Sequence, residues 1–190
     1  MKKIVTFISA VILAIGTLSL TSCDEDQSIA LTLDGSWAGD LYVNTTFSGY
    51  TYYANYSEVE FIADPFNYAS GTGYWIDYYS NAPWDYYASH IRWNVTGGRI
   101  RIYFIEDDYI IDIYDYVISD YYFSGNIEGE DGKWLSFRLR NTTPAKWNSY
   151  RYGWDAWSYG YSKKMDGTRS MQVVPDRDEK PIRHIGKKGN

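Results

Sequence analysis

Residues 91–104, Ile-Arg-Trp-Asn-Val-Thr-Gly-Gly-Arg-Ile-Arg-Ile-Tyr-Phe, decide the fold. Apolar side chains alternate with polar ones on both sides of Gly97-Gly98, which is the two-residue period of a strand with one buried face. A Gly-Gly pair supplies the positive φ angles that the tightest hairpin turns need. The stretch therefore predicts two antiparallel strands that are joined by a short turn and pack on one side of a core.

The same pattern continues in both directions from this hairpin. Residues 59–63 and 135–139 carry apolar side chains at every second position, and short polar breaks of hairpin length separate the segments. No helical period is visible before residue 141. The candidate strands are Trp37–Thr46, Tyr50–Ala63, Gly71–Tyr79, Ala88–Thr96, Arg99–Glu106, Tyr109–Val117, Tyr121–Ile127 and Lys133–Arg140.

Eight short strands in succession, with no helices to cover a parallel sheet, predict an all-β, antiparallel fold. Closing the strands into an up-and-down barrel would remove exposed edges, and about eight strands leave room for side chains or one small ligand. We therefore expect an up-and-down barrel of about eight strands. A β-sandwich built from the same strands is the alternative.

The first 22 residues have the composition of a removable leader. Lys2 and Lys3 precede a nearly uncharged apolar run from Ile4 to Leu20, which is the layout of a secretory signal. The run is almost long enough to cross a bilayer, so an uncleaved transmembrane anchor is the alternative. Small residues directly before Cys23, with no basic cluster after it, favour cleavage.

Residues 20–23, Leu-Thr-Ser-Cys, resemble a bacterial lipobox. The resemblance implies cleavage before Cys23 and attachment of acyl chains such as palmitate to this residue, which is the chain's one cysteine. A plain signal peptide without lipidation is a further alternative, beside the anchor helix. The acidic residues 24–26 resemble an export tag that sends lipoproteins to the outer face of the outer membrane; a solvated spacer is the alternative. We therefore expect an envelope protein that lipidated Cys23 holds on the outer membrane, exposed at the cell surface.

The remainder divides by composition into an acidic linker (residues 23–33), one domain of strands (34–140) and an aromatic-rich segment with a basic tail (141–190). Residues 24–140 carry 6 Lys and Arg against 19 Asp and Glu, whereas residues 141–190 carry 10 against 5. An acidic body repels nucleic acid. The aromatic part is expected to pack on the barrel as a flap or to form an adhesive loop. Residues 163–190 have the composition of a disordered segment, which could also fold back on the body or contact anionic lipid or polysaccharide.

Gly35-Ser36-Trp37, at the start of the first strand, resembles the Gly-x-Trp signature of the lipocalins and the wider calycin group. More closely, residues 34–140 resemble the lipocalin-like domains of bacterial lipoproteins, in which a later strand reads Trp-x-Val before a glycine turn. Residues 93–98 have this pattern here.

The resemblance implies an up-and-down barrel that holds a ligand. It also implies that a basic side chain of the last strand, Arg138 or Arg140, packs over Trp37 at the closed end. The chain departs from the classical family in two respects, because it lacks the helix after the eighth strand and has no cysteine pair.

Catalytic motifs are not apparent. His90 and His184 stand alone, and no free thiol is left once Cys23 carries lipid, so neither a Ser-His-Asp set nor a zinc site can be assembled. The carboxylates of Glu58, Glu60 and residues 106–120 are expected to form a solvated acidic face. Weak cation binding and carboxylate-based hydrolysis are the alternatives. We expect no enzyme, no metal and no cofactor.

The aromatic content is unusually high, with 21 Tyr and 8 Trp. Tyrosine is a good strand former at both buried and wet positions, and its flat amphipathic ring also suits ligand binding. If the rings form a site, we expect it near the loop at residues 81–83, at the barrel mouth. The candidate ligand-binding residues are Tyr78, Tyr79, Trp84 and Tyr86.

Three functions are therefore open. The first is a lipid-anchored envelope barrel that binds a small apolar or saccharide ligand or an envelope partner. The second is a structural or interaction lipoprotein with a filled core and no ligand. The third is a carboxylate-dependent hydrolase, which a buried carboxylate pair facing a cleft would favour.

Overall fold

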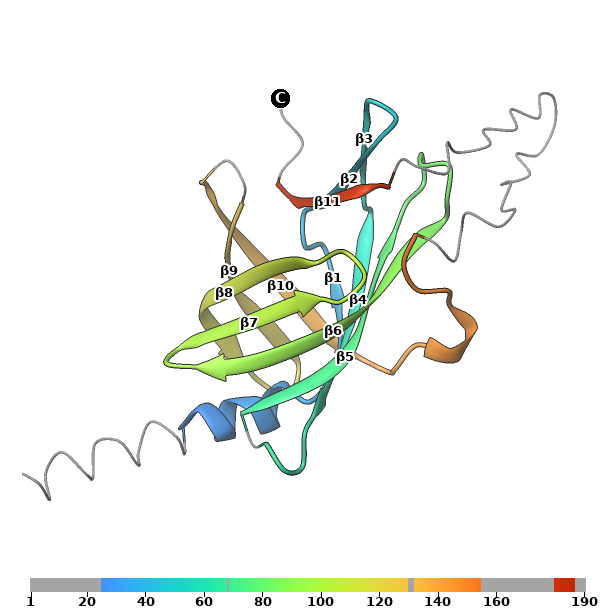
Figure 1. The fold of residues 1–190 in the computed structure, drawn as a ribbon. Coiled ribbons are helices and arrows are strands. Elements are labelled where there is room, and N and C mark those ends of the chain that lie inside the picture. The colour runs from blue at the N-terminus through green and yellow to red at the C-terminus, as the bar shows by residue number, and fades with distance from the viewer. Residues whose placement is uncertain (1–24, 68, 130–131, 155–179, 187–190) are drawn as a thin grey trace, which may run out of the picture.

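The computed structural model describes residues 25–67, 69–129, 132–154 and 180–186. Eight of its strands close into an antiparallel barrel, and three further strands form a small sheet at one end (Figure 1). Neighbours around the barrel follow the order β1-β10-β9-β8-β7-β6-β5-β4, and β4 pairs with β1 to close the ring. The predicted all-β, up-and-down barrel is confirmed, and the sandwich alternative is wrong.

The barrel strands are β1 (Gly35–Gly39), β4 (Tyr56–Ala63), β5 (Ser70–Tyr78), β6 (Tyr86–Thr96), β7 (Arg99–Phe104), β8 (Tyr109–Ile118), β9 (Tyr122–Glu128) and β10 (Trp134–Thr142). The small sheet has the order β11-β2-β3 and consists of β2 (Val43–Phe47), β3 (Tyr50–Tyr53) and β11 (Ile182–Ile185). From β5 to β10 the predicted strands agree closely with the observed ones. The alternating pattern identifies these strands because a shift of one residue would turn every apolar side chain outward.

The two strands expected between residues 37 and 63 are each split in two. Tyr42 has a φ angle of 54°, and its N–H donates to Oδ1 of Asp40 at 2.8 Å, so the chain turns sharply after β1. The β2–β3 hairpin then leaves the barrel, and the chain returns through β4 to pair with β1. The sequence hides this break because residues on both sides of it favour strands.

β4 and β5 approach each other closely at two glycines. A Cβ atom on Gly73 would collide with the carbonyl oxygen of Glu60, and one on Gly71 would collide with that of Ile62 and with the indole of Trp93. Glycine is therefore required at both positions for the strands to pack as they do.

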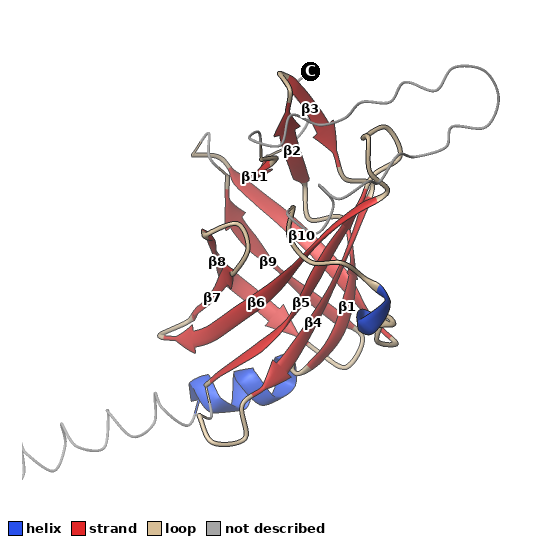
Figure 2. Cartoon of the chain, turned by 45° about the vertical axis from the view of Figure 1, so that its right-hand side comes forward, coloured by secondary structure: helices blue, strands red, loops and turns tan. Residues whose placement is uncertain are grey.

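A helix over residues 25–33 lies across one end of the barrel (Figure 2), which we call the closed end; the opposite end is the mouth. We expected a linker here, and that prediction is wrong. Ala30 and Leu33 are completely buried in the barrel's core cluster, and Nε1 of Trp37 donates to the carbonyl oxygen of Leu33 at 2.9 Å. This bond satisfies one of the carbonyls that a helix end leaves free. Because only a few positions of this short helix are buried, its sequence shows no recognisable helical period.

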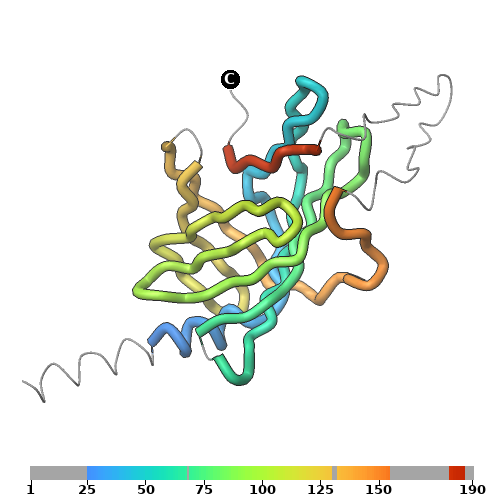
Figure 3. The backbone as a smooth tube through the Cα atoms, in the orientation of Figure 1, coloured from blue at the N-terminus to red at the C-terminus, as the bar shows by residue number. Residues whose placement is uncertain are grey.

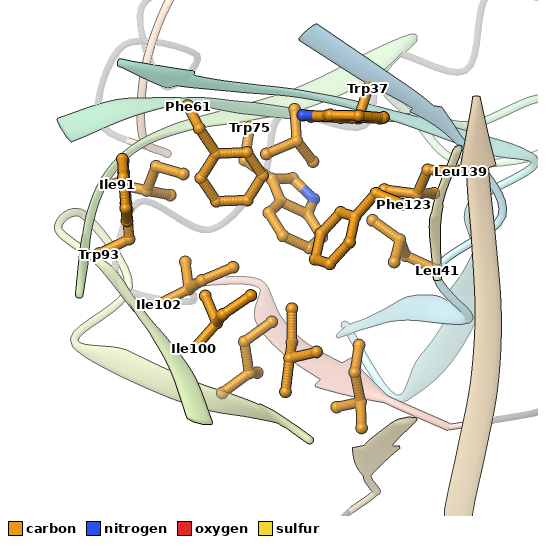
Figure 4. Packing of buried hydrophobic residues seen from close by; sticks show 14 of the residues in the cluster. Trp37, Leu41, Phe61, Trp75, Ile91, Trp93, Ile100, Ile102, Phe123 and Leu139 are labelled. Atoms are coloured by element: carbon orange, nitrogen blue, oxygen red, sulfur yellow. The ribbon is translucent and has the colours of Figure 1, made fainter. Parts of the chain in front are cut away.

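Aromatic and aliphatic side chains point into the barrel between the closed end and the mouth (Figure 4), and the buried members of this cluster are at most 5% exposed. Trp37 packs edge-on against Phe123, with ring centroids 5.8 Å apart, and Phe61 packs in the same way on Trp93 at 5.6 Å. The interior between the two ends is therefore a packed core.

Arg138 and Arg140 do not pack over Trp37, as the resemblance had implied. Alternation along β10 turns both arginines outward, while Leu139 between them is buried inside with Trp37. The guanidinium of Arg138 instead lies 3.8 Å from the ring centroid of Tyr122 on the outer surface. That prediction is wrong, although Gly35 and Trp37 do open the first strand as expected.

β11, the last described strand, lies at the mouth, far from the helix at the closed end (Figure 3). β11 pairs antiparallel with β2, from Ile182 opposite Thr46 to Ile185 opposite Val43. The expected disorder of residues 163–190 is therefore wrong for this strand, and the alternative that the tail folds back is confirmed there. Among the described residues, no helix is both long and apolar enough to span a membrane.

Candidate functional site at the barrel mouth

The interior of the barrel becomes polar at the mouth. Ser57 on β4, Asp77 on β5 and Ser89 on β6 occupy inward positions of their strands, and each is at most 1% exposed. A buried carboxylate among apolar strands is unfavourable unless it is paired and hydrogen-bonded. The groups that pair with Asp77 therefore show how the protein stabilises a buried charge at the mouth.

β11 supplies the countercharge. The side chain of Arg183 is fully buried, with Nη2 3.1 Å from Oδ2 of Asp77 and Nη1 3.3 Å from Oδ2 of Asp107. Its guanidinium carbon lies 4.4 Å from the ring centroid of Phe104 and 5.0 Å from that of Tyr87. The guanidinium makes no hydrogen bond of good geometry to the described residues, so attraction to two carboxylates and two rings offsets its desolvation.

Hydrogen bonds hold both carboxylates in place. Oδ1 of Asp77 accepts from Oγ of Ser57 and from Nε1 of Trp75, both at 2.7 Å. Oδ1 of Asp107 accepts from the hydroxyl of Tyr87 at 2.5 Å, and its Oδ2 accepts from Oγ of Ser89 at 3.1 Å. Donors on β4, β5 and β6 thus hold the two carboxylates beside Arg183.

Burial and the neighbouring charges act in opposite directions on the pKa values of Asp77 and Arg183. Burial raises the pKa of Asp77 above its ordinary value, an effect that the positive charge of Arg183 and two hydrogen bonds oppose only in part. Burial alone would lower the pKa of Arg183, but the carboxylates of Asp107 and Asp77 outweigh it and raise that pKa. Burial and the charge of Asp107 also raise the pKa of Tyr87. Arg183 is therefore charged and Tyr87 neutral at every physiological pH.

A cavity of about 300 Å³ lies beside this ionic centre, between the barrel mouth and the start of β11. We call it the mouth cavity. Aromatic and charged side chains line it, together with Gly153, Pro181 and Ile182. Its aromatic residues are Tyr87, Tyr109, Tyr152 and Trp154, and its charged residues are Glu106, Asp107, Lys180 and Arg183.

Glu106 is fixed at the rim of the mouth cavity by His90. The backbone N–H of His90 donates to Oε2 of Glu106 at 2.8 Å, and the imidazole Nδ1 lies 2.5 Å from Oε1. Tyr152 packs on the imidazole with ring centroids 4.0 Å apart, and the N–H of Gly153 donates to the carbonyl of Ala88 at 2.9 Å. The described part of the aromatic segment, which ends at Trp154, therefore packs on the barrel wall, as in the first of its two expected alternatives, and it contributes to the cavity.

The expected solvated acidic face does not describe Glu106 and Asp107. Their side chains are only 21% and 7% exposed, and both belong to the mouth. The sequence shows an acidic turn at residues 106–108 but not that β11 places a guanidinium against it. Among the described residues, no group of three or more potential ligands could hold a metal ion.

The four residues proposed from sequence as a binding site lie near one another in two pairs, Tyr79 with Trp84 and Tyr78 with Tyr86, but they do not surround a common cavity. Tyr79 and Trp84 are buried in a cluster with Phe47 and Trp154, where the Trp84 ring centroid lies 5.5 Å from Phe47. Tyr78 and Tyr86 lie on the outer wall, where their side chains contact Tyr150. Consecutive strand residues face opposite sides of a sheet, which separates Tyr78 from Tyr79. None of the four lines the mouth cavity.

Sequence reasoning missed Asp77 and Arg183 altogether. Asp77 is a single acidic residue within an aromatic strand, Tyr74-Trp75-Ile76-Asp77-Tyr78. A lone carboxylate among apolar and aromatic residues was the one sequence feature that could have indicated a buried ion pair. Arg183 stands in a short stretch, Pro181-Ile182-Arg183-His184-Ile185, whose isoleucines mark a strand within an otherwise polar tail. Cys23, the expected lipidation site, lies outside the described residues.

Comparison with known proteins adds no relative: no protein-family model, curated protein or solved structure matches the chain.

Proposed function

We propose that the chain is a non-enzymatic, lipid-anchored protein of the cell envelope that binds a small hydroxylated ligand, such as a saccharide unit, in the mouth cavity. The observation that carries the proposal is the cavity itself, about 300 Å³ in volume, with aromatic walls and a fixed set of carboxylates and cations. This volume is at the lower limit of small-molecule sites.

The chemistry of the lining favours a hydroxylated ligand over a purely apolar one. Glu106 and Asp107 are oriented acceptors for hydroxyl donors, and Lys180 is a donor at the same rim. The ring of Tyr152 offers a flat apolar face, which suits the C–H face of a sugar ring. Because the barrel interior is packed with side chains, we place the ligand at the mouth and not deep inside the barrel.

Anchorage through Cys23 would set the direction in which the cavity faces. Only Asp24 separates Cys23 from the helix that covers the closed end. An acyl anchor at Cys23 would hold the closed end at the membrane, so that the mouth faces away from the lipid and toward soluble ligands.

The packed interior also favours a second candidate, a structural or interaction lipoprotein that carries no ligand and contacts an envelope partner. A carboxylate-dependent hydrolase is a weaker candidate. Glu106 and Asp107 do line a cavity together, but donors of the protein hold both carboxylates in place, which suits acceptors that orient a ligand better than groups that exchange a proton with it.

Titration calorimetry of the full mature protein with a panel of neutral and acidic monosaccharides and disaccharides tests the proposal. A binding saccharide should lose at least tenfold in affinity with Tyr152→Ala or Glu106→Gln. Tyr50→Ala, at an exposed tip away from the cavity, should bind as the parent does. Absence of binding across the panel, or equal affinity of all variants, would contradict the proposal.

A further inference from the structure

Three exposed apolar side chains stand on the connections at the closed end. Leu31 on the helix is 61% exposed, Phe66 in the β4–β5 loop is 85% exposed, and Tyr121 in the β8–β9 turn is 73% exposed. Single exposed apolar residues are ordinary on a protein surface. The mouth and the wall expose apolar side chains as well, such as Tyr50, Ile182 and Val117. What distinguishes Leu31, Phe66 and Tyr121 is that they stand at the end nearest to Cys23.

Backbone contacts place all three connections at the same end. The N–H of Ala63, where β4 ends, donates to Oδ1 of Asp34, which directly follows the helix, at 2.8 Å. The N–H of Asn141 donates to the carbonyl of Tyr121 at 2.9 Å, and Asn141 is paired with Trp37 at the start of the barrel. Figure 2 shows the helix and the β4–β5 loop side by side at this end.

The loop that carries Phe66 is held rigidly. Oδ1 of Asp64 accepts from the N–H of Phe66 at 2.8 Å and from that of Asn67 at 3.2 Å, and the N–H of Ser70 donates to the carbonyl of Asn67 at 3.0 Å. A phenylalanine at the tip of a hydrogen-bonded turn is presented to the surroundings before any partner arrives. Little conformational entropy is then lost when the ring is buried.

Tyr121 is presented in the same manner. The N–H of Ser119 donates to the carbonyl of Tyr122 at 2.8 Å, and the N–H of Tyr122 donates back to Oγ of Ser119 at 3.2 Å. Tyr121 therefore stands at the tip of a closed turn. Leu31 is held in place by the helix itself, on the side away from the buried Ala30 and Leu33.

The chain that precedes the helix indicates what lies next to this end. Cys23 and Glu25 are two positions apart, so even a fully extended chain separates their Cα atoms by about 7 Å. Under the alternative of an uncleaved anchor, Leu20 and Glu25 are five positions apart, a span of at most about 18 Å. In both cases a membrane lies within reach of the helix.

We infer that the closed end is a membrane-docking surface, on which Leu31, Phe66 and Tyr121 insert into the interface between lipid headgroups and acyl chains. The inference goes beyond the ligand-binding proposal and rests on its anchorage through Cys23. Leucine and phenylalanine gain from leaving water, and tyrosine is favoured at the headgroup level. The protein would then stand upright on the membrane instead of swinging freely on its acyl anchor.

The charge of this end selects the lipid. Glu25 and Asp26 belong to the helix that carries Leu31, and Asp64 belongs to the β4–β5 loop that carries Phe66, so two of the three docking elements also carry carboxylates. An anionic bilayer would repel them, whereas a zwitterionic bilayer would not. Docking should therefore be strongest on phosphatidylcholine or phosphatidylethanolamine, and weaker when phosphatidylglycerol is added to the bilayer.

The test uses the full mature lipoprotein in phosphatidylcholine vesicles. Leu31→Cys, Phe66→Cys and Tyr121→Cys each introduce the one free thiol of the protein when Cys23 carries lipid, and each receives a nitroxide label. Tyr50→Cys at the tip of the β2–β3 hairpin, where Tyr50 is 68% exposed, is the matched control at the other end. The measured quantity is the accessibility of each label to oxygen, which concentrates in lipid, relative to a water-soluble nickel chelate.

We expect labels at positions 31, 66 and 121 to favour oxygen by several-fold over the label at position 50, and to lose part of that preference when phosphatidylglycerol is added. Equal, water-like ratios at all four positions would overturn the inference. Intact mass spectrometry of the same samples shows whether Cys23 is acylated, and so distinguishes failure of the docking inference from failure of the proposed anchorage. An acylated protein with water-like labels refutes docking alone, whereas an unmodified Cys23 refutes the anchorage together with the inference.

Discussion

Nη2 of Arg183 lies 3.1 Å from Oδ2 of Asp77, and both side chains are completely buried. The arginine belongs to β11, the last described strand, and the aspartate to the mouth end of β5, so one ion pair joins β11 to the barrel. A pair of this kind adds little net stability by itself, but removing one partner leaves the other charge buried and uncompensated.

Arg183→Met should therefore lower the free energy of unfolding by about 3–5 kcal/mol, because Asp77 and Asp107 are left without a countercharge. Urea unfolding measures the loss. Arg140→Met, at an exposed position on the barrel wall, is the matched control and should change stability by less than about 0.5 kcal/mol. Adding Asp77→Asn to Arg183→Met should recover part of the loss. A loss as small as that of the control would contradict the role given to Arg183.

Asp77→Asn should flatten the dependence of stability on pH. The folded-state pKa of Asp77 is raised above the unfolded value of about 3.9, so the folded protein holds this proton where the unfolded chain has released it. The contribution of Asp77 to the free energy of unfolding is therefore complete below the unfolded pKa and declines as the pH rises through the folded pKa. Urea unfolding of parent and variant at a series of pH values above 4 measures the difference. Parallel profiles would show that burial does not control this carboxylate.

Trp37→Ala should destabilise the protein by about 3–5 kcal/mol, since the indole is 1% exposed and contacts both Phe123 and the helix end. Trp37→Phe retains most of the packing and removes the bond to Leu33, so its cost should be nearer 1 kcal/mol. Thermal and urea unfolding compare the two, with Trp134→Ala, at a 54% exposed position, as control. If Trp37→Ala costs less than about 1 kcal/mol, Trp37 does not hold the closed end together.

Gly73→Ala should destabilise the barrel by about 1–3 kcal/mol or more, because the added Cβ collides with the carbonyl of Glu60 and the strands must move apart. Thr72→Ala, at the neighbouring exposed position, should be nearly neutral. Urea unfolding of the two variants shows whether the loss in free energy of unfolding comes from the collision at position 73 or from alanine in β5 in general. Similar stabilities of the two variants would mean that the strands accommodate the methyl group.

The hairpin at residues 91–104 shows how much of the fold was predictable. Its alternating residues face inward as expected, and Gly97 and Gly98 have φ angles of 57° and 77° at the turn. Alternation is a local property, so it predicted the strands from β5 to β10 and, with their number, the barrel. The β2–β3 hairpin escaped prediction because its exit from the barrel depends on a single turn at Tyr42.

The candidate site was much harder to predict. The many aromatic residues near position 81 suggested a ligand-binding site, yet Tyr79 and Trp84 are buried in a hydrophobic cluster. Asp77, Asp107 and Arg183 come from three separate parts of the chain, and only the closed barrel with β11 across its mouth brings them together. No local pattern carries such long-range information.

The most direct test of the proposed function is a native mass spectrum of the mature protein purified from its own envelope. We predict a stoichiometric adduct with the mass of a small hydroxylated molecule, retained by Tyr50→Ala and lost both on unfolding and in the Tyr152→Ala variant. A bare protein mass in every sample would contradict ligand binding at the mouth cavity and would favour the interaction lipoprotein with a filled core.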